Sequence, residues 1–87
     1  MLFMIIERFR DLEGMAERFK AKGRMLPDGL SYQASWIEPS GERCFQLMEA
    51  ENEHLLHTWI SCWDDLVDFE INPVRTSAEF WAKRPSG

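Results

Sequence analysis

The central stretch of this chain, residues 30–49, reads LSYQASWIE-PSGE-RCFQLME. Its first part, Leu30 to Glu38, is rich in the aromatic and branched residues that favour β-strands. Pro39 to Glu42 has the composition of a tight turn. Arg43 to Glu49 then alternates two sets of side chains, with Phe45 and Leu47 on one parity and Cys44, Gln46 and Met48 on the other. The stretch therefore predicts a β-hairpin in the middle of the chain.

The residues before the hairpin predict a strand followed by a helix. Leu2 to Glu7 is apolar on both parities, which is typical of a central strand that is covered on both faces. Asp11 can cap a helix whose apolar residues recur at helical spacing, at Leu12, Met15, Ala16 and Phe19. This amphipathic helix is expected to end near Gly23.

The residues after the hairpin predict a second helix, a fourth strand and a short third helix. Asn52 is a favourable N-cap for a helix whose apolar stripe comprises Leu55, Leu56, Trp59, Ile60 and Trp63. Val67 to Val74 alternates polar and apolar residues and contains Pro73, as an edge strand does. Thr76 to Glu79 fits a capping box that opens the last helix.

The order strand, helix, strand, strand, helix, strand is the ferredoxin-like βαββαβ pattern. We expect an α+β sandwich in which a four-stranded antiparallel sheet carries two helices on one face, with a short C-terminal helix. Right-handed crossovers place the first and third strands in the middle of the sheet. All 87 residues are expected to form a single domain, with a core over 1–75 and a C-terminal helix and tail over 76–87.

The other face of this sheet is expected to be open and apolar, because the first strand is apolar on both parities. An open apolar face of this size usually indicates a partner surface. A second copy of the chain is the simplest partner, so we expect a homodimer that packs sheet to sheet.

The charge of the chain limits its other partners. Fifteen acidic and ten basic residues give a net charge of −5, and Arg43 is the only basic residue from Pro27 to Val74. Phosphate backbones and anionic lipids would be repelled, so no nucleic-acid or membrane partner is expected. Met1 to Ile6 lacks the features of a signal peptide, which favours a cytoplasmic location. Cys44 and Cys62 are expected to be reduced thiols.

Four parts of the chain together resemble a known family: Trp36 before the hairpin turn, Phe45 to Glu49, Trp59 to Leu66, and Asn72 to Val74. They are similar to small bacterial domains of unknown function in the dimeric α/β barrel superfamily. The resemblance implies the ferredoxin-like fold and a dimer, but it implies no particular reaction. The superfamily includes cofactor-free oxygenases, muconolactone isomerases, haem proteins and ligand-sensing domains, and a shared fold does not choose among them.

A candidate ligand site combines aromatic walls with a few polar groups, as small-molecule pockets do. The walls would come from Trp36, Trp59 and Trp63, and the polar contacts from Tyr32 and Gln46. The competing interpretation for Trp59 and Trp63 is simple core packing, because both belong to the apolar stripe of the second helix.

The candidate acid or base residues are Glu49 and His57. Glu49 is the only carboxylate at the interior end of a predicted strand that could be buried, where its pKa would rise; exposure is the alternative. His54 and His57 supply only two ligands from one helix face, so no metal site is expected. Asp64 and Asp65 would oppose the helix dipole if the second helix reached them; otherwise they lie in the following turn.

The leading functional interpretation is a homodimeric module that binds a small, partly apolar molecule or a protein partner without catalysis. One alternative is a cofactor-independent oxygenase or isomerase in which Glu49 or His57 accepts a proton. Another is a structural or assembly module. No glycine-rich phosphate loop, Rossmann fingerprint or nucleophile elbow occurs, so nucleotide-dependent chemistry is not supported and no cofactor is expected.

Overall fold

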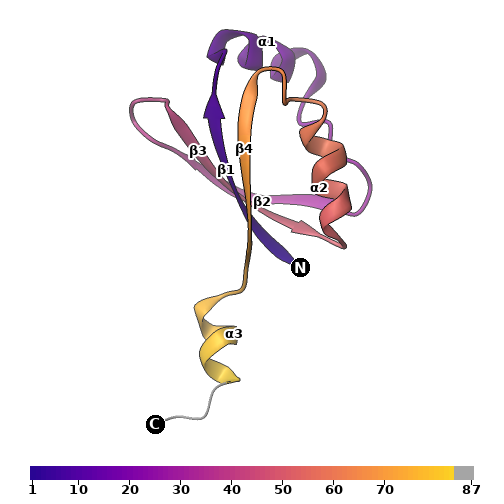
Figure 1. The fold of residues 1–87 in the computed structure, drawn as a ribbon, viewed down its shortest axis with the longest axis vertical. Coiled ribbons are helices and arrows are strands. Elements are labelled where there is room, and N and C mark those ends of the chain that lie inside the picture. Colours follow the sequence, from indigo (N-terminus) through magenta and orange to yellow (C-terminus); the bar gives the residue numbers. More distant parts are fainter. Residues whose placement is uncertain (84–87) are drawn as a thin grey trace.

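The structure is a computed structural model that describes residues 1–83, and the predicted polar tail from residue 84 lies outside this range. Its elements follow one another along the chain as shown in Figure 1: β1 (Leu2–Phe9), α1 (Leu12–Lys22), β2 (Leu30–Ile37), β3 (Arg43–Ala50), α2 (Glu53–Ile60), β4 (Val67–Val74) and α3 (Ser77–Ala82). This order confirms the predicted ferredoxin-like α+β fold with a short C-terminal helix.

The four strands form one antiparallel sheet in the order β2-β3-β1-β4. β1 and β3 are therefore central, as the crossover rule predicts, and β4 is an edge strand. Cross-strand pairs such as Phe3 with Met48 and Glu7 with Cys44 have their side chains on the same face of the sheet. This is the face that α1 and α2 cover.

The core lies between this covered face and α2. Phe3 and Ile5 from β1, Met48 from β3 and Leu56 from α2 are almost completely buried. Burying each side chain of this size contributes about 1.5 to 3 kcal/mol. Trp59 adds an edge-to-face contact with Phe69, with ring centroids 5.5 Å apart. The core joins α2 to the two central strands and to the edge strand β4.

Local hydrogen bonds explain where the helices begin and end. The Asp11 side chain accepts a bond from the Gly14 backbone at 2.9 Å, and the Asn52 side chain accepts one from the Leu55 backbone at 3.2 Å. Both residues are the predicted N-caps. α2 ends at Ile60, and tighter i→i−3 backbone bonds follow it, such as Trp63 N to Ile60 O at 2.8 Å. Trp63 continues the apolar stripe of α2 but lies in the turns beyond the helix.

β2 contains a bulge that changes which face its side chains occupy. Tyr32 pairs with Met48, whereas Ala34 pairs with Leu47, so the register shifts between these two residues of β2. An extra residue in one strand reverses the alternation of the side chains that follow it. As a result Tyr32 lies on the covered face, and Trp36, which pairs with Phe45, lies on the open face.

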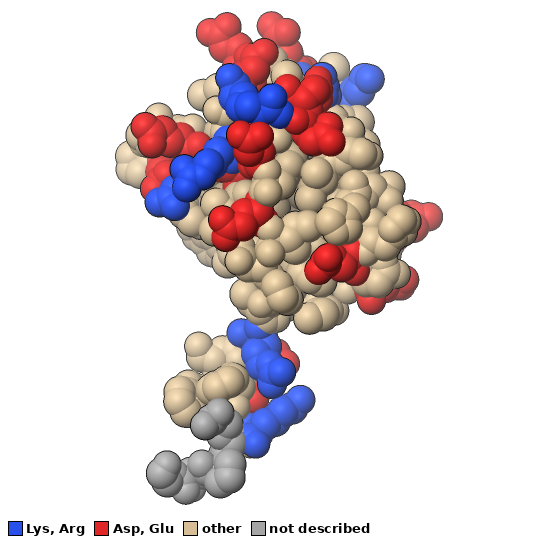
Figure 2. All heavy atoms as spheres, in the orientation of Figure 1, with Lys and Arg blue, Asp and Glu red and all other residues tan. Residues whose placement is uncertain are grey.

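The open face of the sheet carries apolar side chains from the central strands. Met4 and Ile6 of β1 and Phe45 and Leu47 of β3 are only partly buried, and Trp36 of β2 is 56% exposed. α3 lies apart from the helix-covered side of the sheet, at the end of β4 (Figure 1). The helix α3 itself contains no basic residue, but Arg75 and Lys83 flank it, and Figure 2 shows basic side chains in blue around this part of the molecule, whereas acidic side chains are spread over the body.

Within residues 1–83, no helix has the length and apolar character needed to cross a lipid bilayer. The cytoplasmic location remains a prediction.

Candidate functional site

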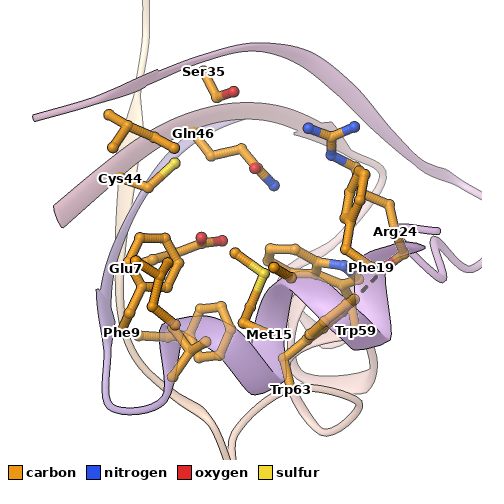
Figure 3. A pocket seen from close by; sticks show the side chains of 15 residues that line it. Glu7, Phe9, Met15, Phe19, Arg24, Ser35, Cys44, Gln46, Trp59 and Trp63 are labelled. Carbon is orange, nitrogen blue, oxygen red and sulfur yellow. Dashed lines mark hydrogen bonds between the residues drawn. The ribbon is translucent and has the colours of Figure 1, made fainter. Parts of the chain in front are cut away.

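A pocket of about 400 Å³ lies on the covered face of the sheet (Figure 3). Pockets for small molecules typically measure about 300 to 1,000 Å³. Most of its lining is apolar and comes from α1, from α2 and the turns after it, and from the strands. The apolar lining residues are Phe9, Leu12, Met15, Ala16, Phe19, Ile37, Trp59, Trp63, Val67 and Phe69.

Glu7 places a carboxyl group inside this pocket. It lies on β1 between Cys44 of β3 and Phe69 of β4, and it is only 7% exposed. Figure 3 shows its carboxyl pointing toward the middle of the pocket. Burial raises the pKa of Glu7 to about 7, although the charge of Arg24 and a hydrogen bond from Cys44 act in the opposite direction. Glu7 can therefore gain or lose a proton near neutral pH.

Two further polar side chains of β3 lie beside Glu7. Burial and the neighbouring carboxyl raise the pKa of the Cys44 thiol to about 11, so this thiol stays protonated and is a poor nucleophile. The buried Gln46 amide nitrogen donates to the sulfur of Met48 at 3.3 Å, which is a weak acceptor. Gln46 therefore has hydrogen-bonding capacity left for a bound molecule.

Arg24 supplies the positive charge of the pocket, and its backbone is held in place by two tryptophans. The indole nitrogens of Trp59 and Trp63 both donate to the Arg24 carbonyl oxygen, at 2.9 and 3.2 Å. Gly23, which ends α1 with a φ of 67°, turns the chain into this position. The hydrogen bonds from Trp59 and Trp63, which come after the hairpin in the sequence, therefore fix the loop that follows α1.

The side chain of Arg24 contacts two aromatic rings and forms no ion pair within residues 1–83. Its guanidinium carbon is 3.6 Å from the ring centroid of Tyr32 and 5.2 Å from that of Phe19. Such stacking holds the guanidinium in place through cation–π attraction. In the described part of the chain no carboxylate forms an ion pair with Arg24, and its Nε atom is buried without a hydrogen-bond partner.

The match of a family model to residues 1–85 identifies the family of this chain. The chain belongs to the family described as Domain of unknown function (DUF3303). The comparisons with curated proteins and with solved structures found no match. The match confirms the resemblance to a family of domains of unknown function, and the observed fold is compatible with the dimeric α/β barrel superfamily.

The structure brings three of the five predicted ligand-site residues of this DUF3303 chain to one pocket. The pocket is lined by Gln46, Trp59 and Trp63. The two tryptophans also belong to the hydrophobic core, so lining the pocket and packing in the core do not exclude each other. Tyr32 contributes indirectly, through its contact with Arg24. Trp36 lies on the opposite face of the sheet because of the β2 bulge. Ligand binding by these residues remains a prediction.

Glu49 and His57, the candidate acid or base residues, lie outside this pocket. The Glu49 side chain is 45% exposed on the other face of the sheet, where it pairs with the N-terminal amine. His57 is 57% exposed and faces Glu53 at 3.3 Å. The inference that Glu49 is the only strand carboxylate available for burial is wrong, because Glu7 is buried. β1 continues through Phe9, and Glu7 shares the parity of the buried Phe3 and Ile5.

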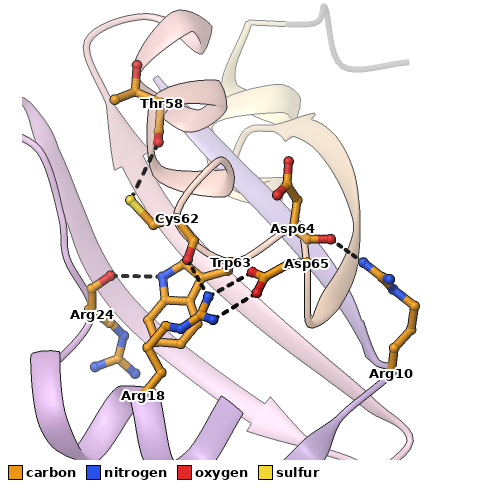
Figure 4. Close-up of polar contacts among 8 residues, drawn as sticks. All are labelled: Arg10, Arg18, Arg24, Thr58, Cys62, Trp63, Asp64 and Asp65. Carbon is orange, nitrogen blue, oxygen red and sulfur yellow. Dashed lines mark hydrogen bonds and ion pairs between the residues drawn. The ribbon is translucent and has the colours of Figure 1, made fainter. Parts of the chain in front are cut away.

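Asp64 and Asp65 connect the turns after α2 to other elements (Figure 4). Arg18 of α1 forms two hydrogen bonds to the Asp65 carboxylate, at 2.7 and 2.8 Å, and this arginine lowers the pKa of Asp65. Arg10 donates to the Asp64 carbonyl oxygen and pairs with Asp68 at 3.0 Å. Because α2 ends before both aspartates, they do not oppose its dipole, and their contacts are structural.

Across residues 1–83, no three His, Cys, Asp or Glu side chains come together as a metal site would require.

Proposed function

We propose that this chain binds a small, largely apolar molecule in the pocket between α1, α2 and the covered face of the sheet. One observation carries the proposal: three buried or partly buried polar groups converge on an apolar cavity, and the protein leaves them incompletely bonded. These groups are the Glu7 carboxyl, the Gln46 amide and the Arg24 guanidinium. Buried polar groups normally have hydrogen-bond partners, and a bound molecule would provide the partners that are missing here.

The arrangement divides the ligand into two parts. An apolar body would pack against the side chains of α1, especially Met15 and Phe19, and against the ring of Phe9. A polar group would reach Glu7 and Gln46. Because the pKa of Glu7 is about 7, its carboxyl can donate to a carbonyl oxygen or accept from a hydroxyl group of the ligand.

The test fills the pocket without changing the charge of the chain. Ala16 lines the pocket, whereas Ala21, which lies on the same helix, does not, so Ala16→Phe and Ala21→Phe form a matched pair. The probe is N-phenylnaphthylamine, a neutral aromatic dye whose fluorescence rises in apolar sites. We expect saturable binding to the wild type and to Ala21→Phe, and binding at least about tenfold weaker to Ala16→Phe, with circular dichroism confirming that both variants fold.

Two outcomes would overturn this proposal. One is unchanged dye binding by a folded Ala16→Phe variant, because the dye would then bind elsewhere. The other is a wild-type protein that binds no dye and carries no small-molecule mass in its native mass spectrum when freshly purified.

A second candidate function is proton-transfer catalysis of the cofactor-independent oxygenase or isomerase type. It is supported by Glu7 rather than by Glu49 or His57, because Glu7 combines a pKa of about 7 with a position inside the pocket. Once a ligand is identified, Glu7→Gln discriminates between binding and catalysis. If the protein is an enzyme, the wild type converts the ligand and this variant binds the ligand without converting it. If the protein is a binding module, neither the wild type nor the variant converts the ligand.

We also propose that the open face of the sheet forms a homodimer. The support is its patch of partly exposed apolar side chains, centred on Phe45 and Leu47 and flanked by Trp36. In a dimer with a two-fold axis, this patch would pack against the identical patch of the second copy. We expect a dimer in native mass spectrometry that dissociates in Leu47→Glu but not in Ala21→Glu, whose substitution lies on α1.

A wild-type monomer would overturn the dimer proposal. A dimer whose pocket binds no small molecule would favour the structural or assembly alternative instead.

A further inference from the structure

We propose that the ligand of this pocket is an organic anion, such as a carboxylate attached to an apolar body, and that Arg24 binds its charged group. This inference rests on the proposed function, since it names the chemical class of the molecule that the same pocket binds. It also assigns Arg24 as the residue that determines this specificity.

The first argument is that no carboxylate within residues 1–83 forms an ion pair with Arg24. Arg10, Arg18 and Arg43 each form an ion pair with a carboxylate, at 3.0, 2.7 and 2.8 Å. Arg24 forms none within residues 1–83, and its Nε donor is buried without any acceptor. Leaving a buried donor of a charged group unbonded is costly, and a ligand oxygen close to the guanidinium would offset part of this cost.

The second argument is that the guanidinium is already positioned. The indole groups of Trp59 and Trp63 hold the Arg24 backbone, and the Tyr32 ring supports its side chain. A planar guanidinium in a fixed orientation presents parallel N–H donors that match the two oxygens of a carboxylate. Little conformational freedom is left to lose on binding, which favours affinity.

The third argument is the charge balance of the pocket. Among the described residues that line it, Arg24 is the only basic residue and Glu7 the only acidic one. Below pH 7 Glu7 is mostly protonated, and Cys44, which also faces it, is neutral because its pKa is about 11. The remaining polar neighbours, Gln46 and Ser35, are uncharged. The pocket then carries one uncompensated positive charge, which an anionic ligand neutralises.

The experiment compares two dyes with the same aromatic body. Anilinonaphthalene sulfonate carries a permanent negative charge, and N-phenylnaphthylamine is its neutral counterpart. We expect Arg24→Met to weaken binding of the sulfonate at least about tenfold while changing binding of the neutral dye by less than about threefold. Arg24→Lys keeps the charge and should recover part of the loss. Lys20→Met, which removes an exposed positive charge from α1, should leave both dyes unaffected.

The pH dependence provides an independent readout. As Glu7 loses its proton between pH 6 and 8, its negative charge should weaken binding of the sulfonate but not of the neutral dye. Glu7→Gln should remove this difference. Because the sulfonate stays ionised throughout, any change in its binding reports on the protein.

Three outcomes separate this inference from the proposed function. If Ala16→Phe blocks the neutral dye but Arg24→Met leaves sulfonate binding unchanged, the anion inference fails and the pocket proposal stands. If Arg24→Met weakens both dyes equally, Arg24 acts only by shaping the pocket, and the inference also fails. If a folded Ala16→Phe binds both dyes as the wild type does, the proposed function itself fails.

Discussion

Glu7→Gln should make the folded protein more stable in neutral and alkaline solution. The ordinary pKa of this carboxyl is 4.5, and burial raises it to about 7 in the folded state. Each tenfold step in an ionisation constant corresponds to about 1.4 kcal/mol, so ionising Glu7 destabilises the folded protein by about 3 kcal/mol. Glutamine has nearly the same shape and carries no charge, and it therefore avoids this cost.

The sign of the effect follows from the two pKa values. Below pH 4.5 the carboxyl is protonated in both the folded and the unfolded chain, so burial carries no penalty for charge. Between pH 4.5 and about 7 the unfolded chain releases the proton while the folded chain keeps it, and stability falls as pH rises. Above about pH 7 both states are ionised and the loss is complete.

The assay is urea unfolding, followed by tryptophan fluorescence, at pH 5, 6, 7 and 8 and at one protein concentration. We expect the stability of the wild type to fall by about 2 to 3 kcal/mol more than that of Glu7→Gln from pH 5 to pH 8. Glu17→Gln, which alters an exposed carboxylate of α1, should follow the wild type. Parallel curves for the wild type and Glu7→Gln would refute the burial of an ionisable Glu7.

Three further predictions concern packing and reactivity. Leu56→Ala should lower the free energy of unfolding by about 2 to 5 kcal/mol in urea, because Leu56 is completely buried; a loss below about 1 kcal/mol would contradict its place in the core. Gly29→Ala should lower the melting temperature, because Gly29 has a φ of 90° and an added Cβ would lie 2.9 Å from the Leu55 side chain; an unchanged melting temperature would count against this turn. Iodoacetamide at pH 8 should alkylate Cys62 well before Cys44 in the folded protein, because the Cys44 thiol is buried with a pKa of about 11; peptide mass spectrometry showing equal rates would contradict its environment.

The order and type of the elements can be predicted from the sequence alone, because the signals for them are local. The caps Asp11 and Asn52 bond to backbone groups three residues away, and both act as predicted. The alternation of Val67 to Val74 and the position of Pro73 likewise predicted the edge strand β4. The βαββαβ order then restricts the sheet to few topologies, so the central positions of β1 and β3 also followed from the sequence.

The set of side chains that share the pocket cannot be predicted in this way, because it depends on strand register and on contacts between distant residues. A one-residue bulge in β2 moves Trp36 to the open face, and no local signal announces the bulge. Glu7 is buried because β1 continues past it and places its side chain on the covered face, between Cys44 of β3 and Phe69 of β4. Arg24 reaches its position through bonds to Trp59 and Trp63, which are 35 and 39 residues away in the chain. Local pattern cannot encode such pairings, since they form only when the sheet and helices pack together.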